Sequence, residues 1–208
     1  MEINRGYSIK GKSKGKLRHW SVLFEKWSQG IDLYIDVTDG DVPYFYKERA
    51  SVSFLAAAAW QCGWVAMQEF ETEKRKPKGR YKAWKGRCDL FICSENRSDF
   101  IEAKYKQLSL NSKNLVENLD KVLADAVSDA HDSKCRQDIN AVGVAFIPFY
   151  AHSKHEHEID ALVEEAISQI KITEADAWAW CFPDSMRRVA SDNDYLNPGM
   201  IMLAKLAE

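Results

Sequence analysis

The run INAVGVAFIPF (residues 139–149) most restricts what this chain can fold into. It is almost continuously apolar, which is typical of a strand covered on both faces of a sheet, as parallel strands are. Amphipathic patterns with the helical period lie on either side, LVENLDKVLADAVSDA (115–130) before it and HEIDALVEEAISQI (157–170) after it. These three segments predict an α/β fold in which helices flank a mixed central sheet.

Shorter patterns divide the rest of the chain of 208 residues, which we expect to form a single domain. Residues 1–16 are rich in Lys, Gly and Ser and predict a flexible basic arm. Residues 17–29 and 44–62 predict helices that end at glycines, and the alternation in IDLYIDV (31–37) predicts a half-exposed strand. Further strands are predicted at 64–71, 87–93 and 99–105, and at 175–182 and 199–206, and we expect the last two to pair at a sheet edge.

Composition limits the class of protein. No apolar run is long enough to span a bilayer, and the N-terminal residues lack the apolar segment of a secretory signal, so we expect a cytoplasmic protein with no membrane partner. The five cysteines, an odd number without a tight framework, fit a reducing compartment. Cys88 and Cys93 lie five apart on a predicted strand and so face opposite sides, which favours packing over a zinc site.

Charge is distributed unevenly along the chain. Residues 1–90 contain 17 Lys and Arg against 11 Asp and Glu, whereas residues 151–208 contain 5 against 11. A basic half on a nearly neutral protein favours one surface that meets a polyanion.

The stretch CDLFICSENRSDFIEAKY (88–105) places charges in two strand-like apolar runs. Burying an unpaired charge in a sheet costs several kcal/mol, so such groups persist when they are paired or bind a metal. Glu102 and Lys104 are two apart and share one face of a strand, and a hairpin would bring Asp89 to the same end. Two carboxylates beside an ammonium suit Mg²⁺ and phosphodiester hydrolysis, because Mg²⁺ prefers oxygen ligands. The alternative is an exposed ion pair at the sheet edge.

This pattern resembles the PD-(D/E)XK nuclease superfamily, the restriction-endonuclease-like fold that includes Holliday junction resolvases. Asp89 matches the acid at the start of the second core strand, and Glu102-Ala103-Lys104 matches the E-x-K of the third. Glu48 stands where the family carries a glutamate on its first helix, and Cys88 replaces the usual proline. The family's αβββαβ core is similar to the order predicted for residues 44–150, with 151–208 adding a C-terminal helix and strands.

The resemblance implies a nuclease that hydrolyses phosphodiester bonds, most often in DNA. Asp89 and Glu102 would hold Mg²⁺ (or Mn²⁺ as a substitute), Lys104 would position the attacking water, and Glu48 would be an auxiliary acid. Residue chemistry alone leaves two alternatives for the acids: Glu48 near a helix start gains from the helix dipole without any catalytic role, and Glu69 or Glu71 could serve as the third acid.

A dense basic connection separates the first two predicted core strands. Like charges repel, so their gathering favours contact with phosphates, with Tyr81 and Trp84 available for stacking on bases; a solvated loop is the alternative. The predicted nucleic-acid-binding residues are Lys74, Arg75, Lys76, Lys78, Arg80, Lys82, Trp84, Lys85 and Arg87. The lysines at 10, 12, 14 and 16, with Arg18, predict a second contact through the arm.

Two other functions fit the sequence. One is a non-catalytic nucleic-acid-binding subunit of a repair, restriction or phage-related assembly. The other is a protein-interaction module that uses the acidic C-terminal part, with Trp178 and Trp180 as contact residues, although their alternation on a strand is more often found in a core. A homodimer is compatible with cleavage of both DNA strands.

Overall fold

The computed structural model describes residues 3–74, 84–133 and 139–207. A mixed sheet runs through the molecule in the strand order β1-β7-β8-β6-β4-β3-β2, with β5 beside β6. The strands are β1 (Arg5–Ile9), β2 (Val65–Lys74), β3 (Trp84–Cys93), β4 (Ser98–Tyr105), β5 (Leu108–Ser109), β6 (Asn140–His152), β7 (Ala177–Cys181) and β8 (Tyr195–Leu206). The predicted α/β class with a mixed sheet between helices is confirmed.

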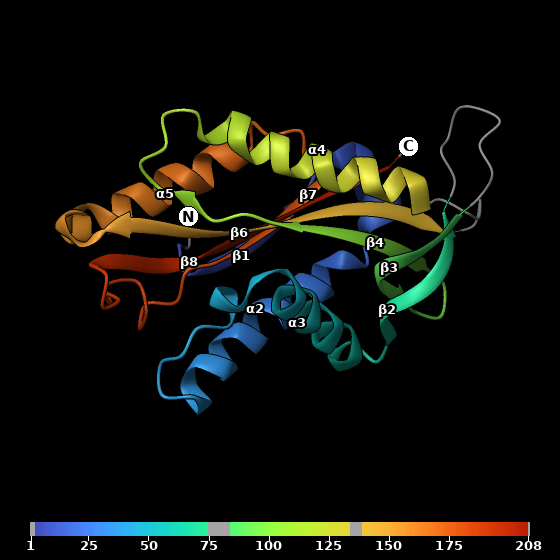
Figure 1. Cartoon of the computed structure of the whole chain (residues 1–208), viewed down its shortest axis with the longest axis horizontal. Coiled ribbons are helices and arrows are strands. Elements are labelled where there is room, and N and C mark those ends of the chain that lie inside the picture. The colour runs from blue at the N-terminus through green and yellow to red at the C-terminus, as the bar shows by residue number, and fades with distance from the viewer. Residues whose placement is uncertain (1–2, 75–83, 134–138, 208) are drawn as a thin grey trace.

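Helices form a layer on each face of this sheet (Figure 1). α4 (Leu115–Ser133) and α5 (Ile159–Ile170) lie on one face, and α2 (Trp20–Val37) and α3 (Lys47–Gln61) lie on the other. Short helical turns complete the chain: Gly11–Ser13, α1 (Lys14–Leu17), Pro43–Tyr46 and Ser153–Glu158. No helix among the described residues is long and apolar enough to cross a membrane.

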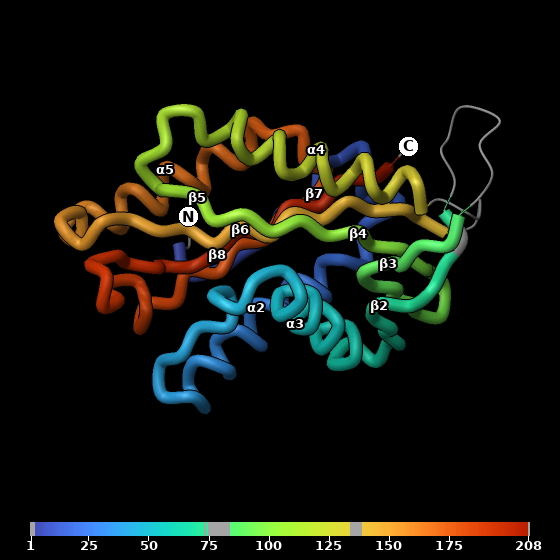
Figure 2. The backbone as a smooth tube through the Cα atoms, in the orientation of Figure 1, coloured from blue at the N-terminus to red at the C-terminus, as the bar shows by residue number. Residues whose placement is uncertain are grey.

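Strand β6 is buried between the two helical layers, as its sequence predicts (Figure 2). It pairs in parallel with β4 and antiparallel with β8. Gly143 on β6 lets α4 approach, because a Cβ at this position would lie 2.4 Å from the backbone nitrogen of Val127. The buried strand thus sets the distance between α4 and the sheet, and α4 carries side chains of the candidate site described below.

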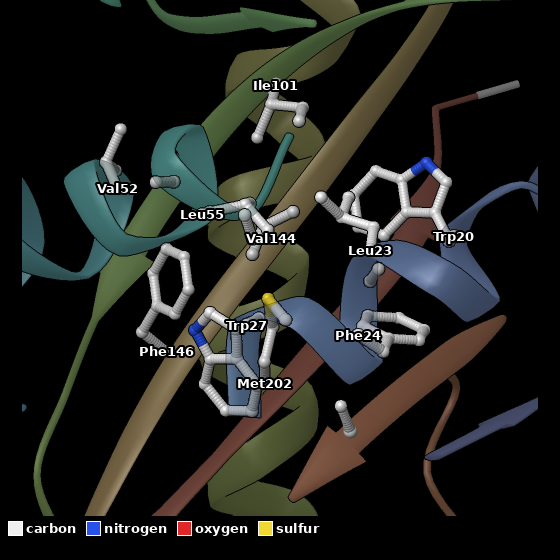
Figure 3. Close-up of a cluster of buried hydrophobic side chains, with 14 of the residues drawn as sticks. Trp20, Leu23, Phe24, Trp27, Val52, Leu55, Ile101, Val144, Phe146 and Met202 are labelled. Atoms are coloured by element: carbon white, nitrogen blue, oxygen red, sulfur yellow. The ribbon is translucent and has the colours of Figure 1, made fainter. Parts of the chain in front are cut away.

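The core on the opposite face is built from α2, α3 and the sheet (Figure 3). Aromatic and aliphatic side chains of α2 repeat at spacings of three and four residues and are buried: Trp20, Leu23, Phe24 and Trp27. Figure 3 shows them packed against Val144, Phe146 and Met202 of the sheet. The predicted amphipathic helix is therefore confirmed.

Its predicted end at Gly30 is wrong, because α2 continues to Val37 and the strand predicted at 31–37 does not form. Ile31 and Ile35 are buried, whereas Leu33 and Val37 are exposed. A segment with apolar residues at alternate positions also contains the four-residue spacing of a helix, and here burial of Ile31 and Ile35 against the core decides between the two.

The flexible arm predicted at residues 1–16 is also wrong for its described part. β1 pairs antiparallel with β7, the amine of Lys10 donates to the carbonyl of Thr173 (2.7 Å), and Ser13 is buried and donates to Asp176 (2.7 Å). β7 and β8 pair as predicted, but β1 and β6 flank them, so they do not form a sheet edge. Trp178 and Trp180 on β7 are buried, which removes them as surface contact residues.

Candidate functional site

The candidate site lies where strands β3 and β4 separate. Their hydrogen-bonded register runs from Cys93↔Ser98 to Leu90↔Ile101 and then stops, while β3 continues beside β2 and β4 beside β6. Asp89 is the next residue of β3, and its Oδ2 accepts a hydrogen bond from the backbone N–H of Ala103 (2.7 Å). The carboxylate of Asp89 therefore accepts the hydrogen bond of a β4 backbone amide that lies beyond the end of the β3–β4 pairing.

Glu102 and Lys104 face α4 together, as the two-residue spacing predicts. Ser133 of α4 donates to Oε1 of Glu102 (2.5 Å), and Lys104 forms an ion pair with Asp129 of α4. Ala103, between them, is buried in the core on the opposite face. Strand alternation thus places one carboxylate and one ammonium side by side under the helix.

A second lysine reaches this carboxylate from β2. Nζ of Lys74 donates to Oε1 of Glu102 (2.8 Å), and both side chains are largely buried, 14% and 4% exposed. Lys74, which is predicted to contact nucleic acid, is therefore not an exposed surface lysine. Lys74 ends β2 and turns inward because Glu102 supplies a buried opposite charge.

Glu48 completes the group from the first turn of α3. Burial raises the pKa of its carboxyl, and the negative charge of Asp89 raises it further, while the charge of Lys104 partly offsets both. A backbone hydrogen bond from Tyr105 also reaches this carboxyl. Glu48 therefore lies close enough to Asp89 and Lys104 for their charges to affect its ionisation.

The ionisation of the two β4 residues follows from their partners. Burial raises the pKa of Glu102, and the negative charge of Asp89 raises it further. The hydrogen bonds from Lys74 and Ser133 act in the opposite direction and lower it. Burial alone would lower the pKa of Lys104, but its hydrogen bond and ion pair with Asp129, together with the charges of Glu48 and Asp89, outweigh this and raise it. Lys104 is thus held as an ammonium.

Carboxylate oxygens suitable for Mg²⁺ are present, but they are not gathered into a preformed cage. Among the described residues no group of three or more His, Cys, Asp and Glu side chains is arranged to hold a metal ion. Both side-chain donors to Glu102 reach the same oxygen, Oε1, and the backbone donor to Asp89 reaches Oδ2. The donor set fits a hard cation that one or two carboxylates hold, with water or phosphate completing its shell.

The alternative acids on β2 have other partners. Glu69 pairs with Arg49 and Arg87, each at 3.0 Å, and Glu71 lies on the surface 3.5 Å from Lys85. Glu69 also has a left-handed backbone (φ 50°), which is uncommon within a strand. The arginines neutralise Glu69, so it is a poorer third acid than Glu48.

Most of the predicted basic connection lies outside the described residues, namely Arg75, Lys76, Lys78, Arg80, Tyr81 and Lys82. Of the rest, Lys85 and Arg87 form the exposed ion pairs with Glu71 and Glu69. Trp84 at the start of β3 is 38% exposed. These three residues remain accessible at the end of the hairpin next to the candidate site.

Two residues of the site, Asp129 and Ser133, were missed by sequence reasoning. They are four apart on α4 and share one helical face, like the charged residues two apart on β4. The two spacings allow the α4 pair to meet the β4 pair, and this was the signal available in the sequence. It predicts a contact only once α4 is known to pack across β4.

Cys88 lies next to Asp89 on β3. Cys88 is buried, and burial, with the nearby charge of Glu102, raises the pKa of its thiol to about 12. A thiol that stays protonated does not bind zinc well. The interpretation of Cys88 as a packing residue agrees with this environment.

Comparison of the chain with protein-family models, curated proteins and solved structures found no match. Its function is therefore inferred below from its own side chains and fold.

Proposed function

We propose that the protein is a metal-dependent nuclease of the PD-(D/E)XK type that hydrolyses phosphodiester bonds, and the resemblance favours DNA as its substrate. The observation that carries the proposal is the gathering of Glu48, Asp89, Glu102 and Lys104 where β3 and β4 separate. The element order α3-β2-β3-β4-α4-β6, interrupted by the two-residue strand β5 before α4, supports it, since the family that the sequence resembles has the order αβββαβ.

Each residue has a role that its surroundings suit. Asp89 and Glu102 would hold Mg²⁺ through carboxylate oxygens, and the chemistry that bound Mg²⁺ supplies is ionisation of a water and compensation of charge at the phosphate. Lys104, kept as an ammonium by Asp129, would orient the attacking water or stabilise charge on the phosphate oxygens. Glu48, whose pKa is raised, would accept a proton from that water.

One observation favours a second candidate, a nucleic-acid-binding subunit that does not cleave. Lys74 already neutralises Glu102, and Asp129 already neutralises Lys104. Charges paired in this way contribute to folding without any reaction, so the same cluster would persist in a protein that only binds.

A cleavage assay separates the two candidates. Wild-type protein with Mg²⁺ or Mn²⁺ is incubated with duplex DNA, single-stranded DNA, a four-way junction and RNA. We expect cleavage of a DNA substrate, and a loss of roughly a hundredfold or more in Asp89→Asn and in Lys104→Ala, with binding retained.

Lys106→Ala is the matched control, because Lys106 is exposed and lies two residues beyond Lys104. It should cleave like the wild type. If wild-type protein binds nucleic acid in a salt-dependent way but cleaves none of the substrates with either metal, the nuclease is excluded and the binding subunit is selected.

A further inference from the structure

A basic cavity of about 1010 Å³ lies away from the candidate active site. Its wall combines strand β1, the helical segment that precedes α2, and the turn between β3 and β4. The side chains that matter are those of Tyr7, Lys14, Arg18, His19 and Arg97. None of them belongs to the cluster around Asp89.

The fold places three cations around this cavity. Lys14 and Arg18 are four apart on one helical face, whereas Leu17 and Trp20, on the other side of the same segment, are buried in the core. Arg97 comes from the β3–β4 turn, and its guanidinium donates to the carbonyl of Gly15 (3.2 Å). That bond ties the turn to the helical segment and holds the third cation beside the other two.

In the part of the chain that the structure describes, no carboxylate forms an ion pair with Lys14, Arg18 or Arg97. Other exposed basic residues do have such partners, as Arg49 and Arg87 have in Glu69. Gathering three unpaired cations at one concave surface costs electrostatic energy, which an anionic ligand would relieve.

His19 adds an oriented polar group to the cavity wall. Its Nε2 lies 2.7 Å from Oδ2 of Asp99, which is fully buried and also accepts hydrogen bonds from Trp20 and from Asn140. The imidazole ring also lies against the ring of Trp64, with centroids 5.6 Å apart. The contacts with Asp99 and Trp64 hold the imidazole ring in one orientation at the cavity wall.

We propose that this cavity binds the phosphates of a single-stranded nucleic-acid segment. Lys14, Arg18 and Arg97 would contact successive phosphates, and Tyr7, which is 38% exposed, offers an aromatic surface to a base. The cavity is at the upper end of the roughly 300–1000 Å³ of small-ligand pockets, and cations from two separate segments suit an extended polyanion.

The inference rests on the nucleic-acid partner in the proposed function, but not on catalysis. On β4, Asp99 contacts the α2 side of the sheet and Glu102 the α4 side, so the cavity lies on the opposite face of that strand from Glu102. The cavity would therefore hold a part of the substrate strand remote from the bond to be cut.

The test measures binding of fluorescently labelled oligothymidylate by anisotropy at several salt concentrations. The double variant Lys14→Glu/Arg18→Glu is compared with Lys113→Glu/Lys171→Glu, which changes the net charge equally at exposed positions outside the cavity. We expect the first to weaken binding roughly tenfold relative to the second and to lower the salt slope by about 1.4, since each phosphate contact on a single strand contributes about 0.7. Arg97→Gln should lower the slope by about half as much.

Equal affinities of the two double variants would overturn the inference, as would full competition by thymidine monophosphate at the same phosphate concentration, which would indicate a small-ligand site. Circular dichroism shows whether each variant is folded. The cleavage assay with Asp89→Asn gives an independent result. If Asp89→Asn loses cleavage while Lys14→Glu/Arg18→Glu binds like the wild type, the cavity proposal is rejected and the nuclease is retained. If Asp89→Asn still cleaves while Lys14→Glu/Arg18→Glu binds weakly, the nuclease is rejected and the cavity proposal is retained.

Discussion

Lys74 on β2 donates a hydrogen bond from Nζ to Oε1 of Glu102 on β4, 2.8 Å away, although β3 lies between their strands in the sheet. The lysine stem crosses β3 at Gly86, where an added Cβ would lie 2.8 Å from Cδ of Lys74. A larger residue at position 86 would block this path. The most buried acid of the candidate site is therefore neutralised through a glycine in the intervening strand.

Replacing Lys74 with Met should destabilise the protein substantially. The substitution keeps an apolar stem but leaves the buried carboxylate of Glu102 without its cation, so we expect a loss of about 3 kcal/mol in the free energy of unfolding. Urea denaturation at neutral pH measures this. Lys85→Met is the control, since its pair with Glu71 is exposed, and it should lose less than about 1 kcal/mol. Equal losses would show that Lys74 contributes no more than a surface pair.

Gly86→Ala tests the crossing itself. The new methyl group would displace the Lys74 stem, and we expect a loss of about 1–2 kcal/mol in the wild-type background. In a Lys74→Ala background the stem is absent, so the same substitution should cost at least about 0.5 kcal/mol less. A double-mutant cycle from urea denaturation gives this coupling. Additive effects would mean that Gly86 matters for another reason.

The sequence predicts the charged residues of the site better than it predicts their partners. Alternation along β4 correctly places Glu102 and Lys104 on one face, because that follows from strand geometry alone. Lys74 and Lys85 look alike in the same basic stretch, yet one is buried and the other exposed. Which lysine turns inward depends on where β2, β3 and β4 pass one another, and that is a property of the tertiary structure.

Asp129→Asn should impair the function of Lys104 without removing its charge. The ion pair with Asp129 raises the pKa of Lys104 against the effect of burial, so loss of the carboxylate should lower that pKa. If cleavage requires the ammonium, the alkaline limb of the pH–rate profile moves to lower pH, and kcat falls by roughly tenfold. Asp125→Asn, an exposed substitution one turn earlier on α4, is the control and should leave the profile unchanged. A lower kcat with an unmoved alkaline limb would indicate a merely structural effect.

Glu48→Gln should become more stable relative to the wild type as the pH rises. Burial and the charge of Asp89 raise the pKa of Glu48 in the folded protein, so this residue favours folding below the ordinary Glu value and that contribution is lost as pH rises through the raised value. Gln does not ionise, so the melting temperature of the variant relative to that of the wild type should rise as the pH rises above about 4, the ordinary value for Glu. Glu117→Gln, in the first turn of α4, controls for loss of a carboxylate at a helix start. A constant difference across this range would contradict the assignment.

The N-terminal residues show a second limit of sequence reasoning. Lysines and glycines at 10–16 give no strand or helix signal of their own, and the flexible arm was predicted for that reason. β1 forms because β7 presents an unpaired edge and the Arg5–Ile9 segment lies within reach of it. Strand pairing between residues about 170 positions apart leaves no local trace in the sequence.

Gly6→Ala distinguishes a docked strand from an arm. Gly6 is paired with Trp180, and an added Cβ would lie 2.3 Å from the indole ring, whereas a Cβ at Gly11 meets nothing within 4 Å. Gly6→Ala should therefore lower the free energy of unfolding by about 2 kcal/mol, and Gly11→Ala should change it by no more than about 0.5 kcal/mol. Thermal and urea unfolding of the two variants measure the difference. In a flexible arm both alanines would be harmless, so only a docked β1 accounts for a loss confined to position 6.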